Sequence, residues 1–127
     1  IIAVINKIKP PYNVNQLTQE RAIERVSDEK SVQVEIATIL EEREKLIEIL
    51  ETVSFVSKIY PTDANFILAK VDDATKRYNQ LLSKGIVVRN RTSQPLCENT
   101  LRFTVGTSKE NNSVITALKA LSKEYGK

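Results

Sequence analysis

Apolar residues recur with the period of a helix through the first half of the chain. Before the prolines at positions 10 and 11, four isoleucines fall on one face of a short segment: Ile1, Ile2, Ile5 and Ile8. This spacing predicts a helix, although so many β-branched residues would also suit a strand. The prolines end the element, because a residue that precedes proline avoids the helical region.

A second helix is predicted directly after the prolines. Asn13 and Gln16 have the spacing of a capping box, which starts a helix that runs to about Val26. The apolar positions of this segment fall on one side, which is expected to be buried: Leu17, Ala22, Ile23 and Val26.

Ser27 and Asp28 break that helix and cap a third, longer one. Its apolar positions keep a 3.6-residue period to about Thr52, and Glu41 and Lys45 have the spacing of an ion pair on its solvated face. A two-stranded coiled coil is the competing interpretation. It is disfavoured because the observed period is closer to 3.6 than to 3.5 residues.

From residue 55 onward, short apolar runs alternate with amphipathic segments. The predicted elements are strands over 55–59 and 65–71, a helix capped by Asp72 that ends at Lys84, strands over 86–88 and 101–105, and a last helix. Gly85 stands where a C′ glycine ends a helix, and Thr107 with Glu110 forms a capping box. This order predicts an α+β fold: one mostly antiparallel small sheet with helices packed on one face.

Two arginines on the last two predicted strands are the candidate site. Alternation places Arg102 on the face opposite the apolar residues of its strand, and Arg89 ends the preceding strand. An arginine in an apolar strand costs free energy unless an anion meets its guanidinium, so the pair predicts an anion site. The alternative is that each arginine pairs with a local carboxylate such as Glu98 or Glu110. Arg91 is expected to face solvent or to stabilise the loop.

Composition removes several classes of chemistry. The 127 residues carry a net charge of +3 and no histidine, so the commonest general base and metal ligand are missing. The one cysteine, Cys97, is expected to be an inert small residue in a reducing, cytoplasmic setting. The aspartates at 72 and 73 are better explained as a cap than as a metal site. No catalytic centre can be assembled from these residues.

Charge and hydropathy also bear on partners. Basic and acidic residues are mixed along the chain, so nucleic acid is not an expected partner, and no apolar run is long enough to span a membrane. The chain contains no methionine and opens within an apolar pattern at Ile1. We therefore expect it to be a piece of a longer protein.

The stretch GIVVRNR, followed by QPLCENTLRFTVGT, resembles the C-terminal signature of the histidinol-phosphate aminotransferases. The stretches KIKPPYNVNQLTQ and YPTDANFILAKV are similar to that family as well. The LRFTVGT element by itself is shared more broadly among fold type I aminotransferases that depend on pyridoxal phosphate (PLP). The combination with IKPPYNVN and GIVVRNR narrows the resemblance to the histidinol-phosphate enzymes.

The resemblance implies an activity in histidine biosynthesis. Such enzymes transfer an amino group reversibly from L-histidinol phosphate to 2-oxoglutarate. The products are imidazole acetol phosphate and L-glutamate. Arg102 would bind the α-carboxylate of glutamate and 2-oxoglutarate, and Arg89 would lie near the substrate phosphate or the distal carboxylate. The full-length enzyme would use PLP and form a homodimer, with small anions as its substrates.

The same resemblance implies a division of the chain. Residues 1–13 would be an interdomain helix and proline-rich linker, and 14–127 the small C-terminal domain. The motifs of the large PLP-binding domain are missing, so no cofactor is expected on this chain and no transaminase activity from it alone. It is expected to self-associate through apolar surface that the large domain would cover. The first alternative is a stand-alone α+β module that binds an anionic metabolite. A weaker one is a nucleic-acid-binding domain, suggested by a sequence pI of about 9.0.

Overall fold

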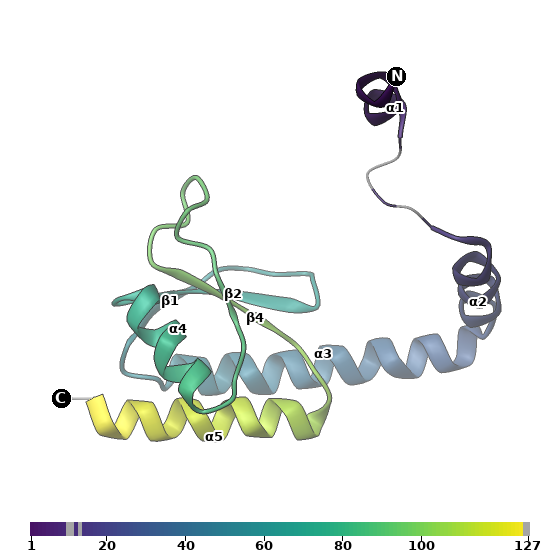
Figure 1. Ribbon diagram of the computed structural model, residues 1–127. Helices are drawn as coiled ribbons and strands as arrows, with labels where there is room; N and C mark the ends of the chain where they lie inside the picture. The colour runs from purple at the N-terminus through teal and green to yellow at the C-terminus, as the bar shows by residue number, and fades with distance from the viewer. Residues whose placement is uncertain (10–11, 13, 126–127) are drawn as a thin grey trace. The chain divides into compact units, whose positions relative to one another are not determined.

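The computed structural model describes residues 1–9, 12 and 14–125 and divides the chain into two compact units (Figure 1). The first unit is Ile1–Glu35 and the second is Ile36–Lys127. The domain boundary expected near residue 13 stays a prediction.

The first unit is helical. Helix α1 (Ile2–Ile8) confirms the helical interpretation of the isoleucine spacing. Helix α2 (Gln16–Ser27) starts at Asn15, whose side chain accepts a hydrogen bond from the Thr18 amide at 2.9 Å. The expected cap, Asn13, lies outside the described residues.

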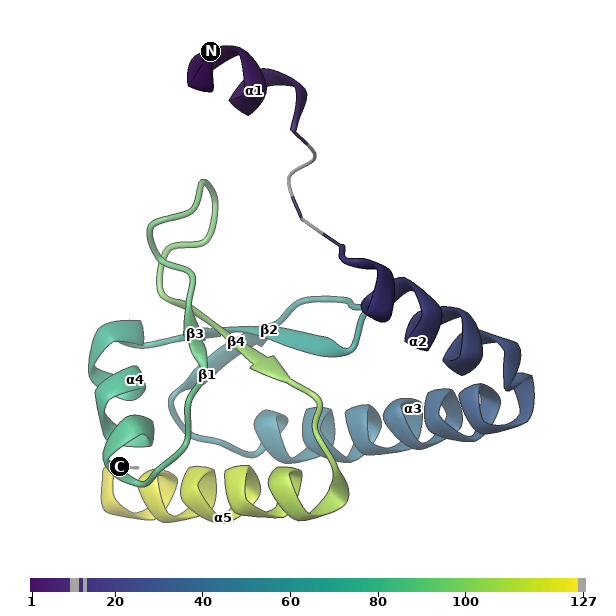
Figure 2. The same cartoon turned by 45° about the vertical axis from the view of Figure 1, so that its right-hand side comes forward.

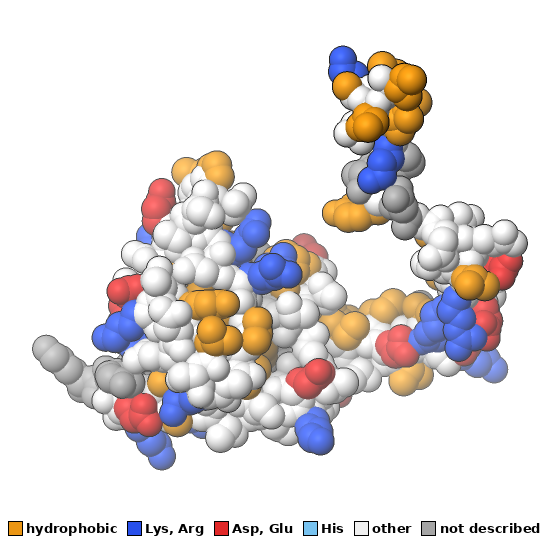
Figure 3. All heavy atoms as spheres, viewed as in Figure 1, with side chains coloured by type: hydrophobic (Ala, Val, Ile, Leu, Met, Phe, Trp, Pro, Cys, Tyr) orange, Lys and Arg blue, Asp and Glu red, His pale blue; other side chains and the backbone are white. Residues whose placement is uncertain are grey.

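The apolar side chains of this unit are exposed, which corrects the expectation for α2. Helices α1 and α2 contain no buried residues, and Figure 3 shows hydrophobic side chains gathered on α1. Leu17, Ile23 and Val26 are each more than two-thirds exposed, at 77%, 68% and 72%. Their spacing predicted the helix correctly, but a periodic apolar side is buried only where another element covers it.

Helix α3 (Glu29–Glu51) begins as predicted, after Asp28. The Asp28 carboxylate accepts a hydrogen bond from the Ser31 amide at 3.2 Å, which caps the helix. The predicted pair forms, with Lys45 Nζ 2.7 Å from a Glu41 oxygen. The buried residues of α3 lie towards its C-terminal end, where Leu46 and Leu50 enter the core of the second unit.

The second unit is a four-stranded antiparallel sheet with helices on one face (Figures 1 and 2), which confirms the predicted α+β fold. The strands have the order β1-β2-β4-β3. Its further elements are β1 (Val56–Ile59), β2 (Phe66–Val71), α4 (Ala74–Ser83), β3 (Arg89–Asn90), β4 (Thr100–Thr104) and α5 (Ser108–Tyr125).

The N-cap of helix α4 lies one residue later than predicted. Its N-cap is Asp73, which accepts a hydrogen bond from the Lys76 amide at 2.9 Å, whereas Asp72 pairs with Arg77. At the other end, Gly85 has the predicted left-handed conformation, with φ +77°. The amides of Gly85 and Ile86 donate to the carbonyls of Leu82 and Leu81, each at 2.9 Å, which is a Schellman motif.

The expected strand over 86–88 does not form, and β3 contains only Arg89 and Asn90. The Ile86 amide is committed to the Schellman motif, so the chain is still leaving the helix at that point. Strand β4 and the last helix follow the predictions closely. The Thr107 amide donates to Glu110 Oε2 at 2.8 Å, as a capping box requires.

One apolar core joins these elements. Strands β2 and β4 each turn alternate residues towards it, and helices α3, α4 and α5 supply the opposing layer. Its most deeply buried large side chains are Leu46, Leu50, Ile67, Leu81, Leu101, Phe103, Leu118 and Leu121. No described helix is long and apolar enough to cross a membrane.

Candidate anion-binding site

The two predicted arginines come together on the sheet face opposite the core. The Cα partner of Arg102 on β3 is Arg89, and its partner on β2 is Leu68. Cross-strand partners share a face, so Leu68, Arg102 and Arg89 form one row across three strands. The neighbours of Arg102 along β4, Leu101 and Phe103, point into the core.

Arg102 is half-buried and lacks a side-chain partner at its buried end. Its Nε is inaccessible to solvent and has no hydrogen-bond partner among the described residues. Its guanidinium lies over the Phe66 ring, with 5.0 Å between Cζ and the ring centroid. The ring supports the guanidinium from one side and leaves its fork of donors available to a ligand.

Neither arginine forms an ion pair with a described carboxylate. Glu110, one of the alternative partners, is held by the capping box with Thr107 instead. The alternative of local carboxylate pairing therefore fails within the described part of the chain. Two like charges directly opposite each other in a sheet are destabilising, and an anion between them would offset that repulsion.

A shallow groove of about 430 Å³ adjoins Arg89. It is lined by Tyr78, Val87, Val88, Arg89 and Asn90. It therefore offers one charged donor beside apolar and aromatic surface, which suits a ligand with an anionic group and a larger apolar or aromatic part.

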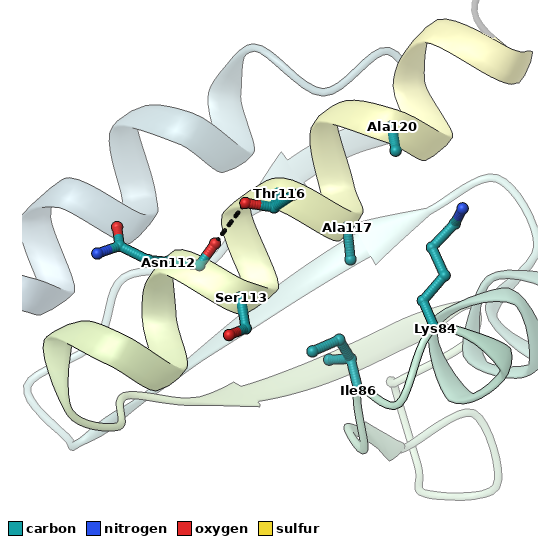
Figure 4. Close-up of a pocket in the computed structure, with 7 residues that line it drawn as sticks. All are labelled: Lys84, Ile86, Asn112, Ser113, Thr116, Ala117 and Ala120. Carbon is teal, nitrogen blue, oxygen red and sulfur yellow. Dashed lines mark hydrogen bonds between the residues drawn. The ribbon is translucent and has the colours of Figure 1, made fainter.

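A second groove, of about 490 Å³, lies between α5 and the segment that follows α4, and neither arginine lines it (Figure 4). Its one charged side chain, Lys84, lies 3.5 Å from Glu124. The hydroxyls of Ser113 and Thr116 donate to carbonyls of their own helix. Its one cationic side chain thus lies near a carboxylate, unlike the two arginines of the row.

Sequence reasoning missed two contributions to this unit. Phe66 was part of a predicted strand, but its place beneath Arg102 follows from the β2–β4 register, which one sequence does not reveal. Arg77 is buried in the core layer and pairs with Asp72. Arg91 and Cys97 are half-buried in the connection between β3 and β4, and Cys97 is a free thiol. No group of potential metal ligands occurs among the described residues.

Comparison with known proteins gives the family. The family model of class I and II aminotransferases matches residues 1–118. A histidinol-phosphate aminotransferase from Flavobacterium johnsoniae is 66% identical over 122 residues, which are 96% of this chain and 35% of that protein. The crystal structure of the histidinol-phosphate aminotransferase from Clostridium acetobutylicum has a TM-score of 0.81 at 27% identity, over 96% of this chain and 37% of the other.

A more distant structure supports the fold alone. The histidinol-phosphate aminotransferase from Sinorhizobium meliloti, solved in complex with pyridoxal-5′-phosphate, has a TM-score of 0.76 at 17% identity, over 95% of this chain and 34% of the other. The chain spans about a third of the length of the curated relatives it matches. With the family model matched along nearly its whole length, the chain belongs to the class I and II aminotransferases.

Proposed function

We propose that the chain is the anion-binding C-terminal part of a cytoplasmic histidinol-phosphate aminotransferase. The observation that carries the proposal is the arginine pair: Arg89 and Arg102 are cross-strand partners with no described carboxylate to neutralise them. The proposed reaction transfers an amino group reversibly from L-histidinol phosphate to 2-oxoglutarate, which gives imidazole acetol phosphate and L-glutamate. Each of these substrates carries a phosphate or a carboxylate, which are the anions that an arginine fork binds best.

The two arginines have different proposed roles. Arg102 is half-buried over Phe66, and a guanidinium fixed in this way suits the α-carboxylate of glutamate and 2-oxoglutarate. Arg89 is exposed beside the 430 Å³ groove, which suits the more variable group: the substrate phosphate or the distal carboxylate. The pair thus binds and orients the anionic groups of the substrate, and we place the groups that carry out the amino transfer outside this chain.

Transamination takes its electron sink from PLP. The buried polar and charged residues that the structure describes are Glu42, Arg77, Thr100 and Asn111. None of them is a lysine, the residue that forms a Schiff base with PLP. We therefore place PLP in the remainder of the full-length enzyme, and propose that the 127-residue chain alone has no transaminase activity.

The proposed partners are small anionic substrates and a second copy of the full-length protein. The exposed isoleucines of α1 support association, because such residues are ordinarily covered in a folded protein. For the 127-residue chain itself, we propose self-association through this surface.

The test uses the complete gene product that contains these residues, with Arg102→Ala, Arg89→Ala and Arg91→Ala compared with the wild type. Wild type should show a PLP absorbance band and transaminate L-histidinol phosphate with 2-oxoglutarate. Loss of a charged bidentate contact should lower kcat/KM of Arg102→Ala by about 10- to 100-fold. Arg91→Ala, in the β3–β4 connection, is the matched control and should stay close to wild type. A full-length protein that binds no PLP would leave the stand-alone anion-binding module as the better account.

A further inference from the structure

We infer that Asn111 is a positioning residue for the arginine pair, and that Glu42 acts with it by fixing the Asn111 amide. The inference rests on the proposed function for the site that is positioned, but the clamp itself is a feature of the fold. It joins α3, α5 and the end of β4 through side chains that are almost completely buried: Glu42 is 6% exposed and Asn111 is 1% exposed.

The Asn111 amide clamps the backbone of Gly106, just beyond β4. Its Oδ1 accepts a hydrogen bond from the Gly106 amide at 2.9 Å, and its Nδ2 donates to the Gly106 carbonyl at 3.1 Å. Gly106 lies beyond the end of β4, so no neighbouring strand pairs with its backbone. The Asn111 amide takes the place of that strand, because it bonds both the N–H and the C=O of Gly106. The backbone that leaves β4 is therefore held in one place.

Glu42 fixes the orientation of that amide. Asn111 Nδ2 donates to Glu42 Oε2 at 2.9 Å, and the Ser108 hydroxyl donates to Glu42 Oε1 at 2.8 Å. Lys45 Nζ also lies 3.3 Å from Oε1. Hydrogen bonds from Asn111 and Ser108 lower the pKa of Glu42 below its ordinary value, against the effect of burial, so this carboxylate is ionised near neutral pH.

The clamp matters to the site because no described residue forms an ion pair with the Arg102 guanidinium, and its buried Nε has no hydrogen-bond partner. Without a carboxylate partner, the place of its guanidinium depends on the backbone of β4 and on the Phe66 ring. The last residue of β4 pairs with Phe66 of β2, and beyond it two further contacts hold the chain: the Val105 amide donates to the Asn65 carbonyl at 2.9 Å, and Asn111 clamps Gly106. Loosening the second contact should move or soften the strand that carries Arg102, and misplacement of a binding group by about 1 Å costs binding and rate.

The chain offers a matched set of variants. Asn111→Asp places a second carboxylate against Glu42, which would repel it and remove the donor to the Gly106 carbonyl. Glu42→Gln in the same chain removes the repulsion and restores a donor opposite the new carboxylate, while the Gly106 carbonyl still lacks its donor, so the double variant E42Q/N111D should recover in part. Asn112→Asp makes the same chemical change on the next residue of α5, which is exposed, and its amide points away from the other labelled side chains in Figure 4.

Two measurements separate this inference from the proposed function. In the full-length enzyme, Asn111→Asp should raise the KM for glutamate by about tenfold, with kcat changed less. The rise should be clearly smaller in E42Q/N111D, and Asn112→Asp should stay within about threefold of wild type. In the 127-residue chain, the ¹H–¹⁵N resonance of the Arg102 Nε–H group should shift in Asn111→Asp and move back towards its wild-type position in the double variant.

A melting temperature that falls in Asn111→Asp while the KM and the Arg102 resonance stay at wild-type values would overturn the inference, because a merely structural role predicts that result. An inactive wild-type enzyme would instead refute the proposed function, and the Arg102 Nε–H resonance alone would then test the inference. If Asn111→Asp does not fold, Glu42→Ala decides, because it removes both oxygens to which Asn111 and Ser108 donate. A rise in KM above about threefold, or a shifted Arg102 resonance, then supports the inference, and unchanged values overturn it.

Discussion

Arg77 grips Asp72 through two parallel hydrogen bonds, from Nε to Oδ1 at 2.8 Å and from Nη2 to Oδ2 at 2.6 Å. The guanidinium also lies over the Phe55 ring, 4.3 Å from its centroid. Only 3% of the Arg77 side chain is exposed, so this pair ties the start of α4 to the core. A buried arginine leaves a large cost if its carboxylate is removed.

The pair predicts an acid-sensitive contribution to stability. Hydrogen bonds from Arg77 hold the pKa of Asp72 below its ordinary value. An unfolded aspartate has a pKa of about 3.9, so the contribution is complete above about pH 5 and is lost as the pH falls through the lower folded pKa. Urea unfolding from pH 7 to pH 2 should show this loss in wild type and not in Asp72→Asn. Asp63→Asn, at an exposed aspartate before β2, should keep the wild-type acid dependence; equal slopes in all three chains would contradict the assignment.

The arginine pair predicts stabilisation by anions. A bound anion at ten times its Kd adds about 1.4 kcal/mol, which is roughly 6 to 11 °C in melting temperature for a unit of this size. Inorganic phosphate should therefore raise the melting temperature of the wild-type chain beyond the effect of sodium chloride at equal ionic strength. The chain with Arg89→Gln and Arg102→Gln should lose the extra increase, and without phosphate it should be slightly more stable than wild type, because like charges no longer oppose each other. An identical phosphate response in both chains would speak against the site.

Gly85 predicts a purely conformational cost. Its φ is +77°, and a Cβ added there would meet nothing within 4 Å. Gly85→Ala should therefore lower the free energy of unfolding by about 1 to 2 kcal/mol, from backbone strain alone, and Gly85→Asn by less. Lys84→Ala, at the preceding C-cap, is the control and should cost less than about 0.5 kcal/mol. Equal costs for the alanine and asparagine variants in urea unfolding would refute the assignment to backbone strain.

Gly106 predicts a steric cost that depends on one neighbour. A Cβ there would lie 2.8 Å from Glu110 Oε2, and the carboxylate can move away only by giving up its hydrogen bonds with Thr107, so Gly106→Ala should destabilise by about 0.5 to 2 kcal/mol. Glu110→Ala costs the capping box but makes room, so the double variant should be less destabilised than the sum of the two single variants, by about 1 kcal/mol. A double-mutant cycle in urea measures this directly, and strict additivity would show that the clash lies elsewhere.

The apolar face of α1 predicts concentration-dependent association of the 127-residue chain. Ile2, Ile5 and Ile8 are 76%, 51% and 78% exposed. Sedimentation velocity over a range of concentrations should show reversible association of wild type, which Ile2→Asp with Ile5→Asp should abolish. Lys7→Ala, on the same helix, is the control and should associate as wild type does. A wild-type chain that stays monomeric throughout would remove this surface as the cause.

Local rules of the sequence predicted most of the second unit, because its elements carry their own boundary signals. Gly85 and the Thr107–Glu110 capping box mark helix ends, and the alternation around Arg102 separates the two faces of β4. The residues that the sequence could not place depend on distant partners. Phe66 reaches Arg102 only through the register of β2 with β4, and the Glu42–Asn111 hydrogen bond links residues far apart in the chain.

The errors have the same origin. Asp72 looked like a helix cap because the sequence does not show that Arg77, buried against Phe55, claims its carboxylate. The apolar side of α2 was expected to be buried because periodicity records what a segment is suited to contact. It does not record whether the partner belongs to the same 127 residues.

The short connection from Gly85 to Arg89 has a consequence for how this sequence tolerates change over evolution. The Schellman motif fixes where the chain leaves α4, and β3 begins at Arg89 with its register to β4 already set. Side chains alternate between the two faces of a strand, so an insertion or deletion of one codon here would exchange the arginine with its buried neighbour Val88. Gene variants that change a residue in this connection should therefore survive selection more often than variants that change its length.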